Sequence, residues 1–94
     1  MAEKLDETGI AQALARLPQW RREGAEIVRE MKFKTYLDGA AFVGRVADLA
    51  EQMNHHPDIL LGWRKVTLRL STHSKGGLTD MDFDLAQKIE ALAP

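Results

Sequence analysis

Three histidines occur in this 94-residue chain, and all of them lie between positions 55 and 73. His55 and His56 are adjacent in the run Asn54-His55-His56-Pro57-Asp58, and His73 ends the run Ser71-Thr72-His73. Histidine is the side chain whose unperturbed pKa lies nearest to neutrality, so a group of histidines supplies both an acid and a base. The spacing therefore favours acid–base chemistry, provided that the fold brings the two ends of this segment together.

A long helix is predicted directly before the paired histidines. Thr35, with Asp38 three residues later, resembles a capping box. Apolar residues then recur at spacings of three and four between positions 42 and 53, which is typical of a helix with one buried face. The helix must end near Asn54, because Pro57 disfavours helical geometry at the residue before it. The histidines are therefore expected just past the end of a helix.

Strands are predicted on both sides of this helix. After a short first helix that Asp6 caps, residues 19–22 and 25–34 form two strands. Residues 58–63 and 65–71 form two more, and His73 follows the last of them.

A final helix begins with Thr79 as its cap and Asp82 as the partner in a capping box. The order of elements predicts an α+β fold. It consists of a four-stranded antiparallel sheet with two long helices packed on one face and a short N-terminal helix.

Composition and charge restrict the classes of function. The length predicts one domain over residues 1–94. Thirteen basic and fourteen acidic residues are interleaved, so neither nucleic acid nor an anionic membrane surface is an expected partner. The apolar stretches are far shorter than the roughly 20 residues of a membrane span, and the first residues are too polar for a secretory signal. We therefore expect a cytoplasmic protein. The absence of cysteine from the sequence excludes disulfides and thiolate metal sites.

Several residues near the histidines have both a functional and a structural interpretation. Glu51 lies one helical turn before His55 and can orient it, or it is a solvated helix residue. The position of Asp82 alone favours a capping role. Trp20 and Trp63 are more often anchors of a core or an interface than platforms for a ligand. Three histidines and a water would suit catalytic zinc. Neighbouring histidines seldom point the same way, however, so no metal site is expected.

Three stretches of the sequence together resemble the pterin-4a-carbinolamine dehydratase family. They are Glu51-Gln52-Met53-Asn54-His55-His56-Pro57-Asp58, the strand from Lys65-Val66 to Ser71-Thr72-His73, and Gly76-Gly77-Leu78-Thr79 to Asp82. The paired histidines with proline and the later Ser-Thr-His are specific in combination, and the resemblance extends over nearly the whole chain. The family includes the animal dimerisation cofactor of a homeodomain transcription factor.

The resemblance implies a dehydratase that removes water from a 4a-hydroxytetrahydropterin and gives the quinonoid dihydropterin, as a step of tetrahydropterin recycling. The pterin is the substrate, and this acid–base reaction requires neither cofactor nor metal. The active-site histidines of the family fall on His55, His56 and His73. His55 and His73 would transfer protons, with the acid and the base left open, and His56 would orient the pterin. The substrate-binding residues that the resemblance implies are Glu51, Trp20, Asp82, Pro57, Ser71 and Thr72.

The resemblance leaves a second class of function open, a non-catalytic protein-binding module of the coactivator or assembly chaperone type. The presence of Glu51 and of all three histidines favours catalysis, because a module that only binds protein is free to lose them. A homodimer or a homotetramer is expected, as is a functional link to an aromatic amino acid hydroxylase. The sequence does not decide between the two oligomers. It also fixes neither the physiological pterin nor any second role.

Overall fold

The computed structural model describes residues 3–93 of the chain, which form three α-helices, one short 3₁₀ helix and one sheet. The sheet contains the strands in the order β1-β2-β4-β3, and all neighbours are antiparallel. The elements in chain order are α1 (Glu7–Leu14), β1 (Arg21–Glu23), β2 (Glu26–Lys32), α2 (Tyr36–Met53), β3 (Asp58–Leu61), β4 (Lys65–Leu70), the 3₁₀ helix η1 (His73–Lys75) and α3 (Asp80–Leu92).

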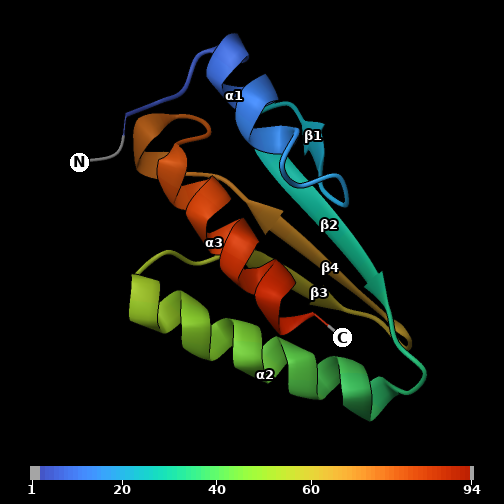
Figure 1. Cartoon of the computed structure of the whole chain (residues 1–94). Helices are drawn as coiled ribbons and strands as arrows, with labels where there is room; N and C mark the ends of the chain where they lie inside the picture. Colours follow the sequence, from blue (N-terminus) through green and yellow to red (C-terminus); the bar gives the residue numbers. More distant parts are fainter. Residues whose placement is uncertain (1–2, 94) are drawn as a thin grey trace.

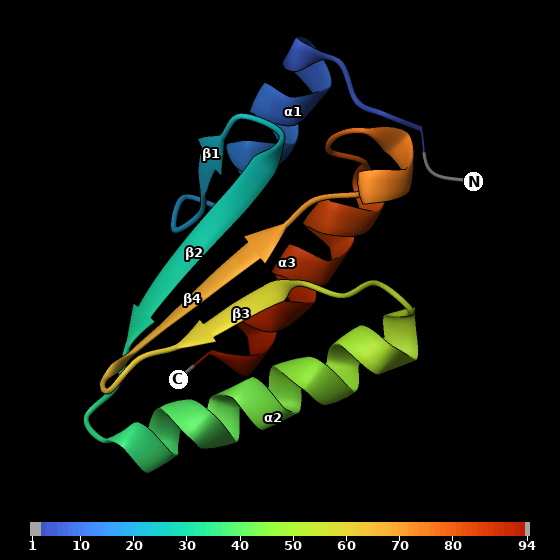
Figure 2. The ribbon, with the colours of Figure 1, turned by 180° about the vertical axis from the view of Figure 1, so that it is seen from behind.

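The two longer helices, α2 and α3, pack on one face of this sheet (Figure 1). The short helix α1 lies near β1 and the start of β2, and the view from behind shows the same arrangement (Figure 2). These findings confirm the predicted α+β fold, including the short N-terminal helix. No helix within residues 3–93 combines the length and the apolar character that crossing a bilayer requires.

The core lies between the sheet and the helices. Alternate side chains of the two central strands are buried on the helix side, as the period of two in these strands predicts. The helices contribute side chains spaced by three or four residues, which fall on one stripe. The residues of this core that are most completely buried are Ile27, Phe42, Val46, Val66, Leu68, Leu70, Leu85, Ala86 and Ile89.

The boundaries of all four strands differ from the prediction by one or two residues. Strand β2 spans Glu26–Lys32 rather than residues 25–34, and β4 ends at Leu70 rather than at residue 71. Strand β1 begins at Arg21 rather than at residue 19, and its partner residues Glu23 and Glu26 enclose a turn of Gly24 and Ala25. Gly24 has a φ of 60°, which side chains with a Cβ rarely adopt. Strand β3 ends at Leu61 rather than at residue 63, because the chain turns back at Gly62, whose N–H donates to the carbonyl of Lys65 at 2.7 Å.

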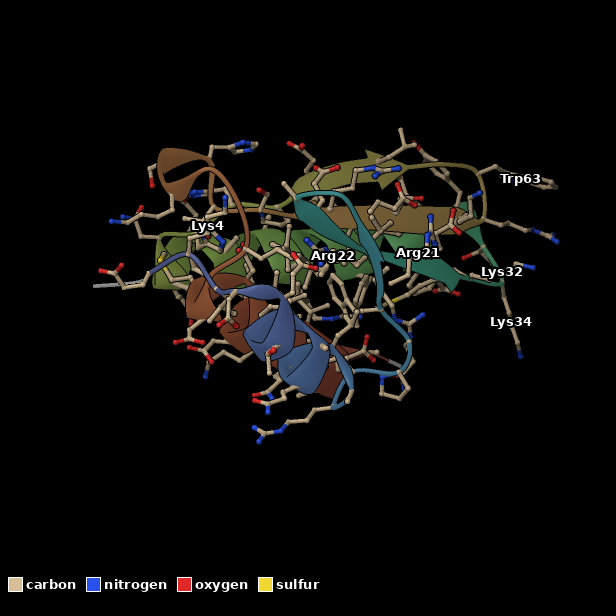
Figure 3. The ribbon with its side chains drawn as sticks, turned by 90° about the horizontal axis from the view of Figure 1, so that it is seen from above. Lys4, Arg21, Arg22, Lys32, Lys34 and Trp63 are labelled. Atoms are coloured by element: carbon tan, nitrogen blue, oxygen red, sulfur yellow. The ribbon has the colours of Figure 1, made fainter. Side chains whose placement is uncertain are left out.

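Trp63 lies in this turn between β3 and β4 and is exposed. The guanidinium of Arg64 lies 4.5 Å from the centre of its ring system, which is a cation–π contact. Figure 3 shows Trp63 at the same end of the molecule as Lys32 and Lys34. The turn is at one end of the β3–β4 hairpin, and the histidine segments precede β3 and follow β4 at its other end. Trp63 therefore lies away from the histidines.

Ion pairs cover the face of the sheet opposite the helices. Arg69 pairs with Glu23 at 2.9 Å, and Lys65 pairs with Glu30 at 3.4 Å. A hydrogen bond from Arg69 is the main cause that lowers the pKa of Glu23, and the charge of Lys65 is the main cause that lowers the pKa of Glu30. These pairs are exposed, so each contributes little to stability.

Acidification is expected to destabilise the fold slightly through these carboxylates. The pKa values of Glu23 and Glu30 are lowered from 4.5 in the folded chain, so their contribution is present above that value. It is lost as the pH falls below 4.5 and through the lowered values of the folded state. Thermal unfolding should show a Tm that falls in this window. The fall should be smaller at about 1 M salt than at about 0.01 M salt, where the screening lengths are roughly 3 and 30 Å.

The double variant Glu23→Gln/Glu30→Gln is the control for this effect. It should show a flatter dependence of Tm on pH than the unmodified chain. An equally steep fall in both proteins would assign the acid sensitivity to other groups.

Candidate active site

The β3–β4 hairpin brings the histidine-bearing segments together. Asp58 at the start of β3 is the partner of Arg69 near the end of β4, so the residues before β3 and those after β4 lie at one end of the hairpin. Figures 1 and 2 show the end of α2 and the loop after β4 on the same side of the molecule. A cavity of about 280 Å³ lies here. It is lined by Asn54, His55, His56, Ser71, Thr72, His73, Ser74 and Met81.

The end of α2 directs His55 inward. Asn54 adopts a left-handed conformation with a φ of 50°. The N–H of Asn54 donates to the carbonyl of Glu51 at 3.2 Å, and the N–H of His55 donates to the carbonyl of Ala50 at 3.1 Å. These two bonds form a Schellman motif, which ends the helix and reverses the chain. As a result, His55 is buried and His56 is exposed, so the adjacent histidines occupy different surroundings.

Replacement of Asn54 by alanine is expected to lower the free energy of unfolding by about 1 kcal/mol, because a Cβ in the left-handed conformation costs roughly 1–2 kcal/mol and asparagine tolerates it better. Asn54→Gly should leave the stability nearly unchanged, since glycine adopts this conformation without strain. Urea denaturation of both variants measures the difference. Equal stability of the alanine and glycine variants would contradict the prediction.

A buried carboxylate holds His55. The Nε2 of His55 lies 2.6 Å from Oδ1 of Asp82, which is fully buried. The second oxygen of Asp82 accepts from the hydroxyl of Thr72 at 2.8 Å and from the N–H of Thr79 at 2.9 Å. An ionised Asp82 accepts from every one of these partners, so Nε2 of His55 must carry a proton. The Nδ1 of His55 is then the nitrogen that can exchange a proton with a ligand.

Asp82 therefore has two roles. The predicted capping box is present, because the Thr79 side chain and the Asp82 side chain each reach the backbone at the other position. The same carboxylate also orients a histidine from a different part of the chain. The carboxylate of Asp82 can therefore cap the helix and orient His55 at the same time.

Glu51 pairs with His56 and not with His55, which corrects the expectation from the sequence. The Oε2 of Glu51 contacts Nε2 of His56, and both side chains are exposed. The reason is that α2 ends at Met53, and the left-handed Asn54 turns His55 away from the helix face that carries Glu51. Residues four apart are neighbours only while the helix continues.

His73 belongs to a short closed loop. It opens the 3₁₀ helix η1 and is exposed beside the cavity. The backbone of Thr72 pairs with that of Gly77, and the N–H of Gly76 donates to the carbonyl of His73 at 3.1 Å. The loop therefore has its own backbone hydrogen bonds, independent of any ligand.

The other predicted residues divide into those that line the cavity and those that do not. Ser71 and Thr72 line it, whereas Pro57 lies in the connection between His56 and β3 and is outside its lining. The sequence patterns indicated no ligand role for three further lining residues, Asn54, Ser74 and Met81. The sequence could have indicated them only by position, because each of them lies directly beside a histidine or Asp82 in the chain.

The side chain of Trp20 lies in the core of the single chain and is not among the residues that line this cavity, so its expected role in substrate binding stays a prediction. Its side chain is 4% exposed, and its Nε1–H donates to Oε1 of Glu90 at 2.7 Å. Arg29 donates to the same oxygen at 2.7 Å. In the single chain, Trp20 has the position of a core anchor.

No group of three or more histidine, aspartate or glutamate side chains within residues 3–93 is arranged to hold a metal ion. The side chains at the cavity are suited to proton transfer: an inward histidine oriented by a carboxylate, an exposed histidine paired with a carboxylate, and an exposed histidine in a loop.

Comparison with known proteins shows a match to one family model. The model described as pterin 4 alpha carbinolamine dehydratase matches residues 3–92. A protein of Nocardia farcinica, whose name assigns it provisionally to the pterin-4-alpha-carbinolamine dehydratases, is 50% identical over 97% of this chain and 96% of its own length. A protein of Thermosynechococcus vestitus with the same name is 45% identical over 99% of this chain and 98% of its own length.

Two solved structures resemble the fold. A transcriptional coactivator/pterin dehydratase from Brucella melitensis superposes with a TM-score of 0.93 at 32% identity, over 98% of this chain and all of that one. A pterin dehydratase-like protein, identified as a RuBisCO assembly factor in the alpha-carboxysome, superposes with a TM-score of 0.68 at 27% identity. That match covers 80% of this chain and 89% of the other.

Proposed function

The chain belongs to the pterin 4 alpha carbinolamine dehydratase family, and from this premise we propose that it is a hydro-lyase that converts a 4a-hydroxytetrahydropterin to the quinonoid dihydropterin and water. The observation that supports this most directly is the position of all three histidines around one cavity, with His55 oriented by the buried Asp82.

The reaction is a matter of two proton transfers. The C4a hydroxyl must receive a proton in order to leave as water, and the adjacent N5 must lose one. The number of protons on the protein is therefore the same after both steps, and exchange with solvent returns the acid and the base to their starting forms. A positioned histidine can perform either step. We assign the two transfers to His55 and His73, without deciding which is the acid. His55 exchanges its proton at Nδ1, because Asp82 occupies Nε2 and stabilises the imidazolium when it forms.

The remaining side chains would hold the pterin. His56, paired with Glu51, is exposed at the mouth of the site and orients the substrate. The amide of Asn54 and the hydroxyl of Ser71 line the cavity, and both can bond to the polar edge of a pterin. The hydroxyl of Thr72 is already bonded to Asp82, so a ligand would meet the backbone of that residue. The pterin itself is the substrate, and no cofactor takes part in this proposal.

Stopped-flow absorbance of a 4a-hydroxytetrahydropterin generated in situ tests the proposal. The protein should accelerate its decay, and His55→Ala/His73→Ala should remove the acceleration, since each general acid or base contributes about 10²–10⁴-fold. Trp63→Ala is the matched control. Trp63 is exposed at the end of the β3–β4 hairpin away from the histidines, so its replacement should not change the rate. A folded wild-type protein that leaves the decay rate unchanged would overturn the proposal. It would favour a protein-binding role, such as the assembly role reported for one structural relative.

We also propose that the chain forms a homodimer or a homotetramer and acts beside an aromatic amino acid hydroxylase, whose product it would dehydrate. Strand β3 is an edge of the sheet and carries the exposed Leu60, and Leu37 is exposed at the start of α2. Edge strands with exposed apolar side chains favour association. Sedimentation equilibrium measures the mass of the assembly, and a monomer at micromolar concentration would contradict this part.

A further inference from the structure

Two buried hydroxyl groups lie in a row behind the carboxylate that orients His55. The Oγ1 of Thr72 lies 2.8 Å from Oδ2 of Asp82, and the Oγ1 of Thr79 lies 2.8 Å from that of Thr72. Thr72 is 5% exposed and Thr79 is fully buried. Water therefore has little access to this row, and its hydrogen bonds must be completed within the protein.

The hydrogens of this row have one consistent direction. The Oγ1 of Thr79 already accepts from the N–H of Met81 at 3.2 Å. The hydroxyl of Thr72 donates to Asp82, so its oxygen is free to accept, and the proton of Thr79 must be the one it accepts. If the hydroxyl of Thr72 donated to Thr79 instead, it could not donate to Asp82, and the carboxylate of Asp82 would lose a partner. Both hydroxyl protons thus point toward Asp82.

We propose that Thr79 and Thr72 are positioning residues, which keep Asp82 an acceptor at both oxygens and thereby keep the proton of neutral His55 on Nε2. The second oxygen of Asp82 accepts from the hydroxyl of Thr72 and from the N–H of Thr79, so this oxygen has two donors directed at it and acts as an acceptor. An ionised carboxylate at 2.6 Å requires a donor at Nε2 of His55. The row thus leaves Nδ1 of His55 as the reactive atom. The catalytic part of this inference rests on the proposed dehydratase function, whereas the statement about the tautomer does not.

Thr72 and Thr79 have different structural roles besides their hydroxyl bonds, and this difference separates the effect on His55 from a loss of stability. The backbone of Thr72 is held separately by its pairing with Gly77, so removal of its hydroxyl leaves the loop closed. Thr79 also caps α3, so its replacement weakens a helix end as well. Thr35 caps α2 in the same way, with its side chain accepting from Asp38, and has no contact with Asp82. Thr35→Val is therefore the matched control for a lost cap.

The experiment compares Thr72→Val and Thr79→Val with Thr72→Ser, Thr79→Ser and Thr35→Val in the intact chain. Two readouts are recorded: the nitrogen-15 chemical shifts of the His55 ring, which report the tautomer, and the kcat and KM for pterin dehydration. We expect wild-type His55 to carry its neutral-state proton on Nε2. Each valine variant at the row should shift this tautomer and lower kcat by about 10–100-fold, by analogy with the range found when the hydrogen-bond partner behind a metal-bound histidine is removed.

The serine variants should restore both readouts, because they retain the hydroxyl, and KM should change little throughout. Thr35→Val should alter neither tautomer nor kcat. A wild-type His55 with its proton on Nδ1, or a folded Thr72→Val with an unchanged tautomer, overturns the proposal. If Thr79→Val fails to fold, Thr72→Val decides alone, because it removes no cap. A wild-type protein without dehydratase activity would refute the proposed function, and the tautomer readout would still decide the role of the row.

Discussion

Asp82→Asn is expected to lower kcat by about 10²–10⁴-fold, the contribution of a general acid or base. The amide has one accepting oxygen, and the N–H of Thr79 and the hydroxyl of Thr72 both require it. Its NH₂ group must then face Nε2 of His55, which has to accept instead of donate. The ring proton of neutral His55 moves to Nδ1, and the reactive lone pair is lost. Because the substitution preserves the shape of the side chain, the fold should survive, and stopped-flow kinetics with nitrogen-15 shifts of His55 measure both effects.

Asp80→Asn is the control for Asp82→Asn. Asp80 lies in the same first turn of α3, but it is exposed and is not part of the His55 contact. Both substitutions remove a negative charge from the start of the helix, where the dipole favours one. Only the change at Asp82 should affect kcat. Wild-type kcat in Asp82→Asn, with the His55 proton still on Nε2, would show that the carboxylate does not set the tautomer.

Local signals made the order of elements predictable. Thr35 and Thr79 are caps in the sequence and in the structure. The helix before the histidines ends at Met53, because the next residue, Asn54, has a left-handed backbone. The apolar face of β4 was also predictable, because Val66, Leu68 and Leu70 are all buried and a one-residue shift would expose them. The ends of β1 and β3 could not be located as well, because a turn is decided by pairing with a partner strand rather than by composition.

The candidate site was predictable as a set of residues but not as a set of contacts. The antiparallel pairing of β3 and β4 is what joins the histidine segments, and the sequence supports that pairing. The contact between His55 and Asp82 joins the end of α2 to the start of α3, and no local spacing encodes it. The helix rule assigned Glu51 to His55, whereas the Schellman motif gives it to His56.

The burial of Trp20 in the single chain leaves its expected role in substrate binding a prediction. The resemblance assigned it to the pterin pocket, and the single chain buries it against Glu90. A large aromatic side chain with one polar atom fits either place, because burial requires only that its N–H finds an acceptor. The acceptor is Glu90, a charged residue on the inner side of α3 that the helical pattern alone does not explain. Trp20 and Arg29 both donate to Glu90, so replacement of Glu90 should lower the stability of the fold by a predictable amount.

Glu90→Ala is expected to lower the free energy of unfolding by about 2–3 kcal/mol, the upper range for hydrogen bonds that involve a charged group. The side chains of Arg29 and Glu90 are each only 18% exposed, and Oε1 of Glu90 accepts from both Arg29 and Trp20 at 2.7 Å. Without the carboxylate, the guanidinium keeps its charge with little water to solvate it, and the indole N–H has no acceptor. Urea denaturation measures the loss.

Glu90→Gln separates the two contributions. Its amide oxygen can still accept from Trp20 or Arg29, so about half of the stability should be retained, while the charge of Arg29 remains uncompensated. Glu90 lies on the side of α3 that faces Trp20 and not the histidines, so the activity per folded molecule should stay unchanged in both variants. If Glu90→Ala is as stable as the wild type, the buried contact is not a structural anchor. A loss of dehydration rate without a loss of stability would instead favour the expected role of Trp20 in substrate binding.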